Sequence, residues 1–284
     1  MSDAGDAARF RDREGALAFI ASLAPAGERE LPIAEAALAF ASLDRPQVDL
    51  ERYRDHLHEL AQAVAAAGPV AEIGARAAAL AQALVGRFRY EGDRLSYEDL
   101  QNANLMRVID RRKGLPVALG ILYLHAGRAQ GWPMAGLAFP GHFLLRIEDG
   151  GARGVIDPFN GGKLLDAAAL RELLRSLAGD ERPLAPEHYR GVSDRDVLLR
   201  LQNNLKLRLL QSGDRGRALA VLERMRLLVP ESAALAREAG VLLAEQGELR
   251  AAIRSLEQAL ALEPESRLRF ATASLLQDLR TRLQ

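Results

Sequence analysis

A 34-residue repeat in the last third of the chain limits its fold more than any other feature. Four positions recur 34 residues later: Gly213, Ala218, Leu222 and Pro230 return as Gly247, Ala252, Leu256 and Pro264. A glycine in the turn, small residues where two helices cross and a proline after the second helix are typical of the tetratricopeptide repeat. A pair of unrelated helical hairpins is the alternative. Since two repeats bury little on their own, we expect support from the preceding domain and from a capping helix over 267–283.

The middle of the chain predicts a buried helix followed by strands. Pro116 suits the first turn of a helix, and the residues up to Leu124 leave almost no polar face, which is typical of a helix surrounded by protein. Three short apolar runs follow and predict strands over 134–139, 143–147 and 154–159. Helices followed by an antiparallel sheet indicate an α+β domain.

Apolar spacing and turn residues predict further helices on both sides of this region. Ser96 is the expected N-cap of the helix that precedes Gly114, and Asp166 that of the helix after the strands. The expected helices cover 32–43, 46–68, 70–88, 96–113 and 166–177.

Composition excludes several classes of function. The 38 basic and 38 acidic residues balance, so the chain lacks the electrostatic footprint of a general nucleic-acid or membrane binder. The absence of cysteine excludes disulfides, thiolate metal sites and thiol catalysis. We expect no cofactor and no metal. The N-terminus lacks the pattern of a secretory signal and no apolar run reaches the roughly 20 residues of a membrane span, so we expect a cytoplasmic protein.

Several ordered motifs resemble those of a known bacterial family. The runs NANLMRVIDRRKGLPVALGILYLHAGRAQGW, FPGHFLLR, IDPFNGG and LLRLQNNLK, with the two repeats, are similar to the SirB-type proteins. That family joins a transglutaminase-like domain to C-terminal tetratricopeptide repeats. The resemblance implies an N-terminal segment over 1–31, a papain-like α+β domain with a helical N-terminal part over 32–178, a linker over 179–195, and an all-α repeat region over 196–284.

The resemblance also implies a site from which one part is missing. Catalytic relatives carry a cysteine where the central helix begins, then a histidine and an aspartate on neighbouring strands. His142 and Asp157 match the latter two, while the cysteine position falls near Leu115 and Pro116. Family members often have serine where this chain has Ala103 and Ala118, which argues against a serine mechanism. We therefore expect His142 and Asp157 to persist as a buried, hydrogen-bonded relic pair.

Two hypotheses of function follow. The first, which we favour, is a regulatory or interaction protein that binds one or more polypeptides through the repeats. A groove between 104–114 and the loop over 139–142, which would hold a peptide without cutting it, is a second binding site under this hypothesis. Arg200, Asn203 and Arg237 are the candidate partner contacts of the repeats, because their helical spacing directs donors toward a carboxylate, although solvated polar positions would look the same. The second is a hydrolase or acyltransferase that uses His142 as a base for water, oriented by Asp157. The two are distinguished by whether His142 lies open beside a cavity or is packed under Phe139 and Phe143.

The remaining polar or aromatic positions have structural interpretations. The following are expected: His56 and His58 on a solvated helix face, His125 as a hydrogen-bonded core residue, 160–163 as a plain turn, Arg111–Lys113 as the basic end of a helix, and Trp132 in the core.

Overall fold

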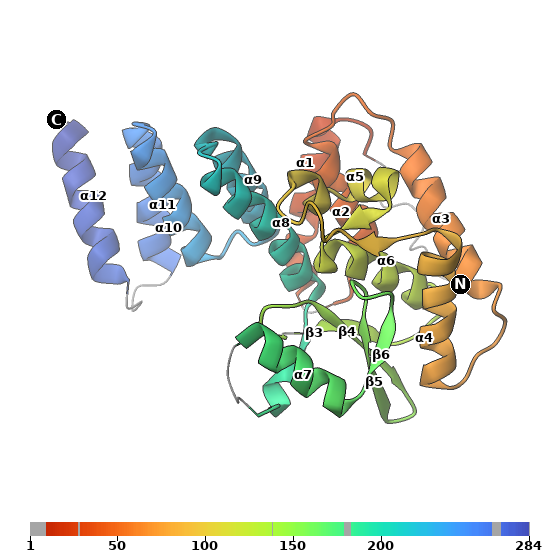
Figure 1. Cartoon of the computed structure of the whole chain (residues 1–284). Coiled ribbons are helices and arrows are strands. Elements are labelled where there is room, and N and C mark those ends of the chain that lie inside the picture. The colour runs from red at the N-terminus through yellow and green to blue at the C-terminus, as the bar shows by residue number, and fades with distance from the viewer. Residues whose placement is uncertain (1–9, 28, 138, 179–182, 263–267, 284) are drawn as a thin grey trace. The chain divides into compact units, whose positions relative to one another are not determined.

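The computed structural model describes residues 10–27, 29–137, 139–178, 183–262 and 268–283. The chain divides into two compact units (Figure 1). The first is formed by Met1–Phe19 with Ala26–Leu201, and the second by Ile20–Pro25 with Gln202–Gln284. No helix within these described ranges is both long enough and apolar enough to span a membrane.

The first unit surrounds helix α6 with other helices. The α-helices that begin in it are α1 (Arg13–Ser22), α2 (Ile33–Ser42), α3 (Glu51–Ala65), α4 (Ile73–Ala81), α5 (Leu105–Arg111), α6 (Pro116–Arg128), α7 (Ala167–Ala178) and α8 (Asp194–Gln211). Shorter turns of helix are η1 (Ala24–Ala26), η2 (Gln82–Arg87), η3 (Leu100–Ala103) and η4 (Pro186–Tyr189). Pro116 is the first residue of α6, as predicted, and Ala118 to Leu124 are almost entirely inaccessible to solvent.

The single helix expected over 96–113 is wrong. Asp99 caps the short η3, and Asn104 then caps α5 with its side-chain oxygen. Ser96 caps nothing and instead donates its backbone N–H to Asp93. Arg112, at a φ of 60°, ends α5 in the left-handed region. Successive polar side chains bond the local backbone here and so break one helix into two pieces.

A five-stranded antiparallel sheet has the order β6-β5-β4-β3-β7. Its strands are β3 (Met134–Leu137), β4 (Leu144–Asp149), β5 (Ala152–Asp157), β6 (Lys163–Leu165) and β7 (Gly191–Val192). The three inner strands confirm the predicted apolar runs. The outer strands β6 and β7 were not predicted, because they are too short to show an alternation of apolar and polar residues. A separate parallel pair joins β1 (Glu91–Gly92) to β2 (Lys113–Gly114).

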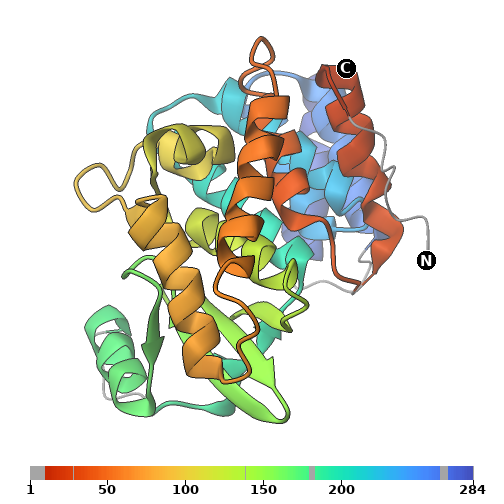
Figure 2. The same ribbon diagram turned by 90° about the vertical axis from the view of Figure 1, so that its right-hand side faces the viewer.

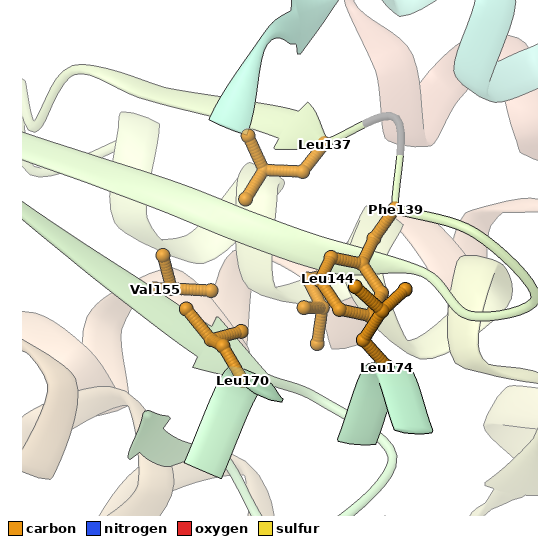
Figure 3. Packing of buried hydrophobic residues seen from close by; sticks show 6 residues of the cluster. All are labelled: Leu137, Phe139, Leu144, Val155, Leu170 and Leu174. Atoms are coloured by element: carbon orange, nitrogen blue, oxygen red, sulfur yellow. The ribbon is translucent and has the colours of Figure 1, made fainter. Parts of the chain in front are cut away.

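The sheet lies between helices on both faces (Figures 1 and 2). Leu144 and Val155 point toward α7 and contact Leu170 and Leu174 there (Figure 3). Side chains alternate along a strand, so the neighbouring residues face α6 and α4. The Phe143 ring lies so close to α6 that a Cβ on Gly120 would overlap it.

The second unit confirms the predicted repeats. Its helices beyond α8 are α9 (Arg215–Leu228), α10 (Ala233–Glu245), α11 (Leu249–Leu262) and α12 (Arg269–Leu283). Gly213 and Gly247 have the same φ of 80° in equivalent turns. The equivalent small and apolar positions, Ala218, Ala252, Leu222 and Leu256, are all fully buried. Residues of α12 pack with those of α11 in one apolar cluster, as expected of a capping helix.

Candidate functional site

Sheet pairing brings His142 and Asp157 together. His142 lies just before β4 and Asp157 ends β5, and the register of these strands pairs Leu145 with Ile156. The His142 Nε2 atom is 3.0 Å from Asp157 Oδ1. His142 is 8% exposed and Asp157 is 1% exposed. The two residues that the resemblance singles out thus form a buried hydrogen-bonded pair.

Asp157 accepts more hydrogen bonds from its own turn than from the histidine. The backbone N–H groups of Phe159 and Asn160 donate to Oδ1 at 3.0 and 3.1 Å, and Asn160 Nδ2 donates to Oδ2 at 2.6 Å. Burial alone would raise the pKa of Asp157, but the bonds from His142 and Asn160 outweigh it and lower that pKa. The carboxylate is therefore ionised at neutral pH, and His142 Nε2 is the donor.

The second ring nitrogen of His142 faces away from Asp157. Nδ1 has no hydrogen-bond partner in the part of the chain that the structure covers. The ring meets Phe159 edge-on, with centroids 6.0 Å apart. Phe139 packs against His188, so the aromatic ring beside His142 is that of Phe159 and not that of Phe139.

The start of α6 offers no nucleophile. Leu115, Pro116, Val117 and Ala118 are all buried, and none has a side-chain heteroatom. In the described ranges no group of three or more His, Asp or Glu side chains is placed to hold a metal ion. The first residues of α6 therefore place no hydroxyl or thiol nucleophile in this domain, which does contain a bonded histidine–carboxylate pair.

Tyr123 is a polar residue of this region that the sequence reasoning missed. Its side chain is fully buried in α6, and its hydroxyl has no hydrogen-bond partner among the described residues. Burial and the nearby Asp157 carboxylate raise the pKa of Tyr123. A Cβ on Gly162 would overlap this hydroxyl, so the glycine turn after Asp157 closes directly over it. The only available signal was a tyrosine within an otherwise apolar helix.

The three residues proposed to contact a partner differ in their burial and in the side chains around them. Arg200 belongs to the first unit, donates to the His142 carbonyl at 2.8 Å and lies over the Phe143 ring. Burial lowers the pKa of Arg200. Asn203 is half-buried in α8. Arg237 lies in α10 and donates from Nε to Thr272 at 3.0 Å. Arg200 was expected to act with the repeats, but its end of α8 belongs to the first unit.

One of the two histidines expected on a solvated face is buried. His56 is 7% exposed, and its Nε2 lies 2.8 Å from Tyr90 Oη and contacts the Arg112 guanidinium. Burial, with the Arg112 charge, lowers the pKa of His56 to about 4. His58, two residues away, is exposed as predicted. The error arose because the segment around Tyr90 covers one side of α3, which helical periodicity does not reveal.

The interpretations of His125 and Trp132 are confirmed, whereas only Arg111 of the expected basic cluster lies in a helix, because α5 ends there and Lys113 begins β2. His125 Nε2 lies 3.1 Å from the Leu57 carbonyl oxygen, and Trp132 is 9% exposed. Arg111 and Lys113 form ion pairs with Asp93 and Glu91. Residues 160–162 lie in the turn between β5 and β6, and Lys163 is the first residue of β6.

The sheet, the central helix and the histidine–aspartate pair define a transglutaminase-like domain. A family model described as the transglutaminase-like superfamily matches residues 51–203, and a tetratricopeptide-repeat model matches 205–277. The chain belongs to the SirB-type UPF0162 family of this superfamily.

Relatives of this family cover most of the chain. The UPF0162 protein of Xylella fastidiosa is 31% identical over 252 residues, which is 86% of this chain and 89% of the relative. The UPF0162 protein of Vibrio cholerae is 32% identical over 183 residues, or 64% of this chain and 67% of the relative. A crystal structure of menin aligns with a TM-score of 0.41 at 10% identity, covering 89% of this chain and 70% of menin.

Proposed function

We propose that the protein is a non-catalytic polypeptide-binding module with an interaction or regulatory role. Two observations carry this proposal together: the His142–Asp157 pair is intact and buried, and the start of α6 holds only apolar side chains. In acyl transfer the carboxylate orients the histidine and the histidine takes a proton from the nucleophile. Without a nucleophile, the His142–Asp157 hydrogen bond is retained, but His142 has no side chain from which to take a proton.

The hydrogen bonds of Asp157 support a structural reason for keeping the pair. Three of the four bonds to this carboxylate come from Phe159 and Asn160, within its own turn. A buried carboxylate needs partners, and His142 supplies the remaining one. The pair therefore stabilises the turn that leads from β5 to β6.

The repeats support a polypeptide as the ligand. Stacked helix pairs of this kind form extended surfaces that bind peptides or partner helices. The balanced charge of the chain favours such a partner over nucleic acid or an anionic membrane surface. We place this activity in the cytoplasm, and we keep Arg200, Asn203 and Arg237 as candidate contacts of the partner.

A hydrolase or acyltransferase is the second candidate, and the unpartnered Nδ1 of His142 is the observation that favours it. In that mechanism a water molecule transfers one proton to Nδ1 while its oxygen bonds to a carbonyl carbon and the C=O π electrons move to the carbonyl oxygen. Asp157 stabilises the resulting imidazolium. The tetrahedral intermediate then reforms C=O and breaks the bond to the leaving amine or alcohol, which takes the proton back from Nδ1.

The two candidates are separated by measuring turnover and capture with the same full-length samples. Wild type and His142→Gln are incubated with glutamine-containing model peptides and an amine donor, and each is used to capture polypeptides from a bacterial lysate. We expect ammonia release no higher than in buffer, and at least one polypeptide that is retained specifically. Turnover that disappears in a folded His142→Gln sample would establish the enzyme instead. Failure to retain any polypeptide would refute the binding module.

A further inference from the structure

A polar groove lies beside the turn that Asp157 organises. It has a volume of about 390 Å³ and is lined by residues 91–95, Lys113, 159–161 and Lys163. One wall is β1 with the loop after it, and the other is the segment between β5 and β6. The Phe159 ring belongs to the groove and also meets His142 edge-on, so this ring separates the groove from the His142–Asp157 pair.

The first argument is the unused backbone edge of β1. The N–H groups of Glu91 and Asp93 donate to the carbonyls of Arg112 and Gly114, at 2.9 and 3.2 Å. Alternate residues of a strand bond to the same neighbour, so the N–H and C=O of Gly92 point to the opposite edge. Such an edge is a template for another strand.

The second argument is the shape of the groove. Gly92 lies against the Phe159 ring, where a Cβ would come within 2.5 Å of the ring atoms. At Gly161, by contrast, a Cβ would meet no atom within 4 Å. The Phe159 ring therefore covers Gly92 on that side, whereas the wall at Gly161 presents backbone without a side chain, which lets the main chain of a ligand approach closely there.

The third argument is charge. Of the two acidic residues in the groove, Glu91 forms an ion pair with Lys113, and Asp93 is 3% exposed and pairs with Arg111. Arg94 donates to the neutral side-chain oxygen of Asn160. Lys163 is exposed and forms no ion pair with any residue that the structure describes.

Two positive charges, those of Arg94 and Lys163, therefore remain without an acidic partner in the groove. The adjoining loop adds apolar surface, because Leu95 is 93% exposed and Tyr97 is 39% exposed. A ligand with carboxylates and apolar side chains complements this combination.

We propose that this groove binds an extended acidic segment of the partner polypeptide as a strand added to the free edge of β1. Main-chain bonds to Gly92 supply affinity, and Arg94 and Lys163 select acidic side chains. This inference rests on the proposed function, since it names the kind of segment that the transglutaminase-like unit recognises.

The test uses full-length protein and defined probes. A fluorescein-labelled peptide in which Glu alternates with Val over about six residues, the length of a typical strand, is titrated at low salt. Its matched probes replace each Glu with Lys, or a central Val with Pro, which lacks the N–H that a strand needs. The protein variants are Lys163→Glu and, as a control with the same charge change at an exposed site in α7, Arg171→Glu.

The proposal predicts that the acidic peptide binds about tenfold more tightly than either matched probe. Lys163→Glu should weaken this binding about tenfold, while Arg171→Glu should change it less than about twofold. Hydrogen exchange of the Gly92 amide should slow when the acidic peptide is bound. No binding of the acidic peptide at about 1 mM, or equal losses in the two variants, would overturn the proposal. If lysate polypeptides are still captured in that case, the groove assignment fails while the binding module stands.

Discussion

Replacing Asp157 with Asn tests whether the main role of the carboxylate is to stabilise the turn after β5 or to orient His142. An asparagine has one oxygen, which can keep the three bonds now made to Oδ1. Its NH₂ group would then face the Nδ2 donor of Asn160, which now bonds to Oδ2 at 2.6 Å. The substitution thus removes one charge-assisted bond, places two donors against each other, and weakens three further bonds.

The expected loss of stability follows from those four bonds. A hydrogen bond to a charged group contributes about 1.5–3 kcal/mol and a neutral one about 1 kcal/mol, so the sum of one lost and three weakened bonds is about 3 kcal/mol. For a unit of this size, each kcal/mol lowers the melting temperature by about 2–4 °C, which gives a fall of about 6–12 °C. His142→Gln removes only one of the four donors to this charged group and should cost about 1.5–3 kcal/mol.

The assay is urea unfolding of the full chain at several pH values. The pKa of Asp157 is lowered in the folded state, so its stabilisation is fully present above about pH 4 and is lost as the pH falls through the folded value. The Asp157→Asn protein should therefore differ from wild type at neutral pH and approach it in acid. A loss below about 0.5 kcal/mol, or a larger loss for His142→Gln than for Asp157→Asn, would refute the structural explanation of the pair.

Three further predictions concern the glycine turns and the buried histidine. Gly162→Ala should cost about 2–4 kcal/mol in urea unfolding, because φ is 70° and the new Cβ overlaps the Tyr123 hydroxyl, and Tyr123→Phe should recover part of that loss. Gly247→Ala and Gly213→Ala should each cost about 1 kcal/mol of stability, because both glycines have a φ of 80° and open space for a Cβ. Clearly different losses in the two variants would contradict the equivalence of the two repeats. The pKa of His56 is about 4 when folded and 6.5 otherwise, so the unfolded chain binds its proton first as the pH falls. Stability should therefore decrease by up to about 3 kcal/mol between these pH values, and His56→Gln should flatten that dependence.

Local sequence patterns predicted those helices and turns that require particular residue types at short spacing. The repeated glycines and small residues identified the helical hairpins, because a left-handed turn and a close helix crossing each demand a particular residue type. The apolar stretch from Pro116 to Leu124 identified the buried helix for the same reason. The helix expected over 96–113 failed because Asp93, Asp99 and Asn104 satisfy local backbone groups that periodicity ignores.

The site was predictable only in part. Order along the chain and the family resemblance identified His142 and Asp157, and the absence of cysteine was evident from composition. That Phe159 and Asn160 supply most of the bonds to Asp157 depends on the path of the turn after β5. The positions of Tyr123 and Arg200 beside this pair were not predictable, because α6 and α8 reach it from distant parts of the sequence.

By itself, the sequence determined the repeat period, the buried central helix, the inner strands and the lack of a nucleophile, because each of these depends on residue types at short spacing. Only the tertiary structure decided which polar side chains are buried and which backbone edges remain unpaired. His56 is buried by a segment more than thirty residues away, and the free edge of β1 depends on its pairing with β2. Contacts between distant segments set burial and hydrogen bonding there, and such contacts leave no local period in a single sequence.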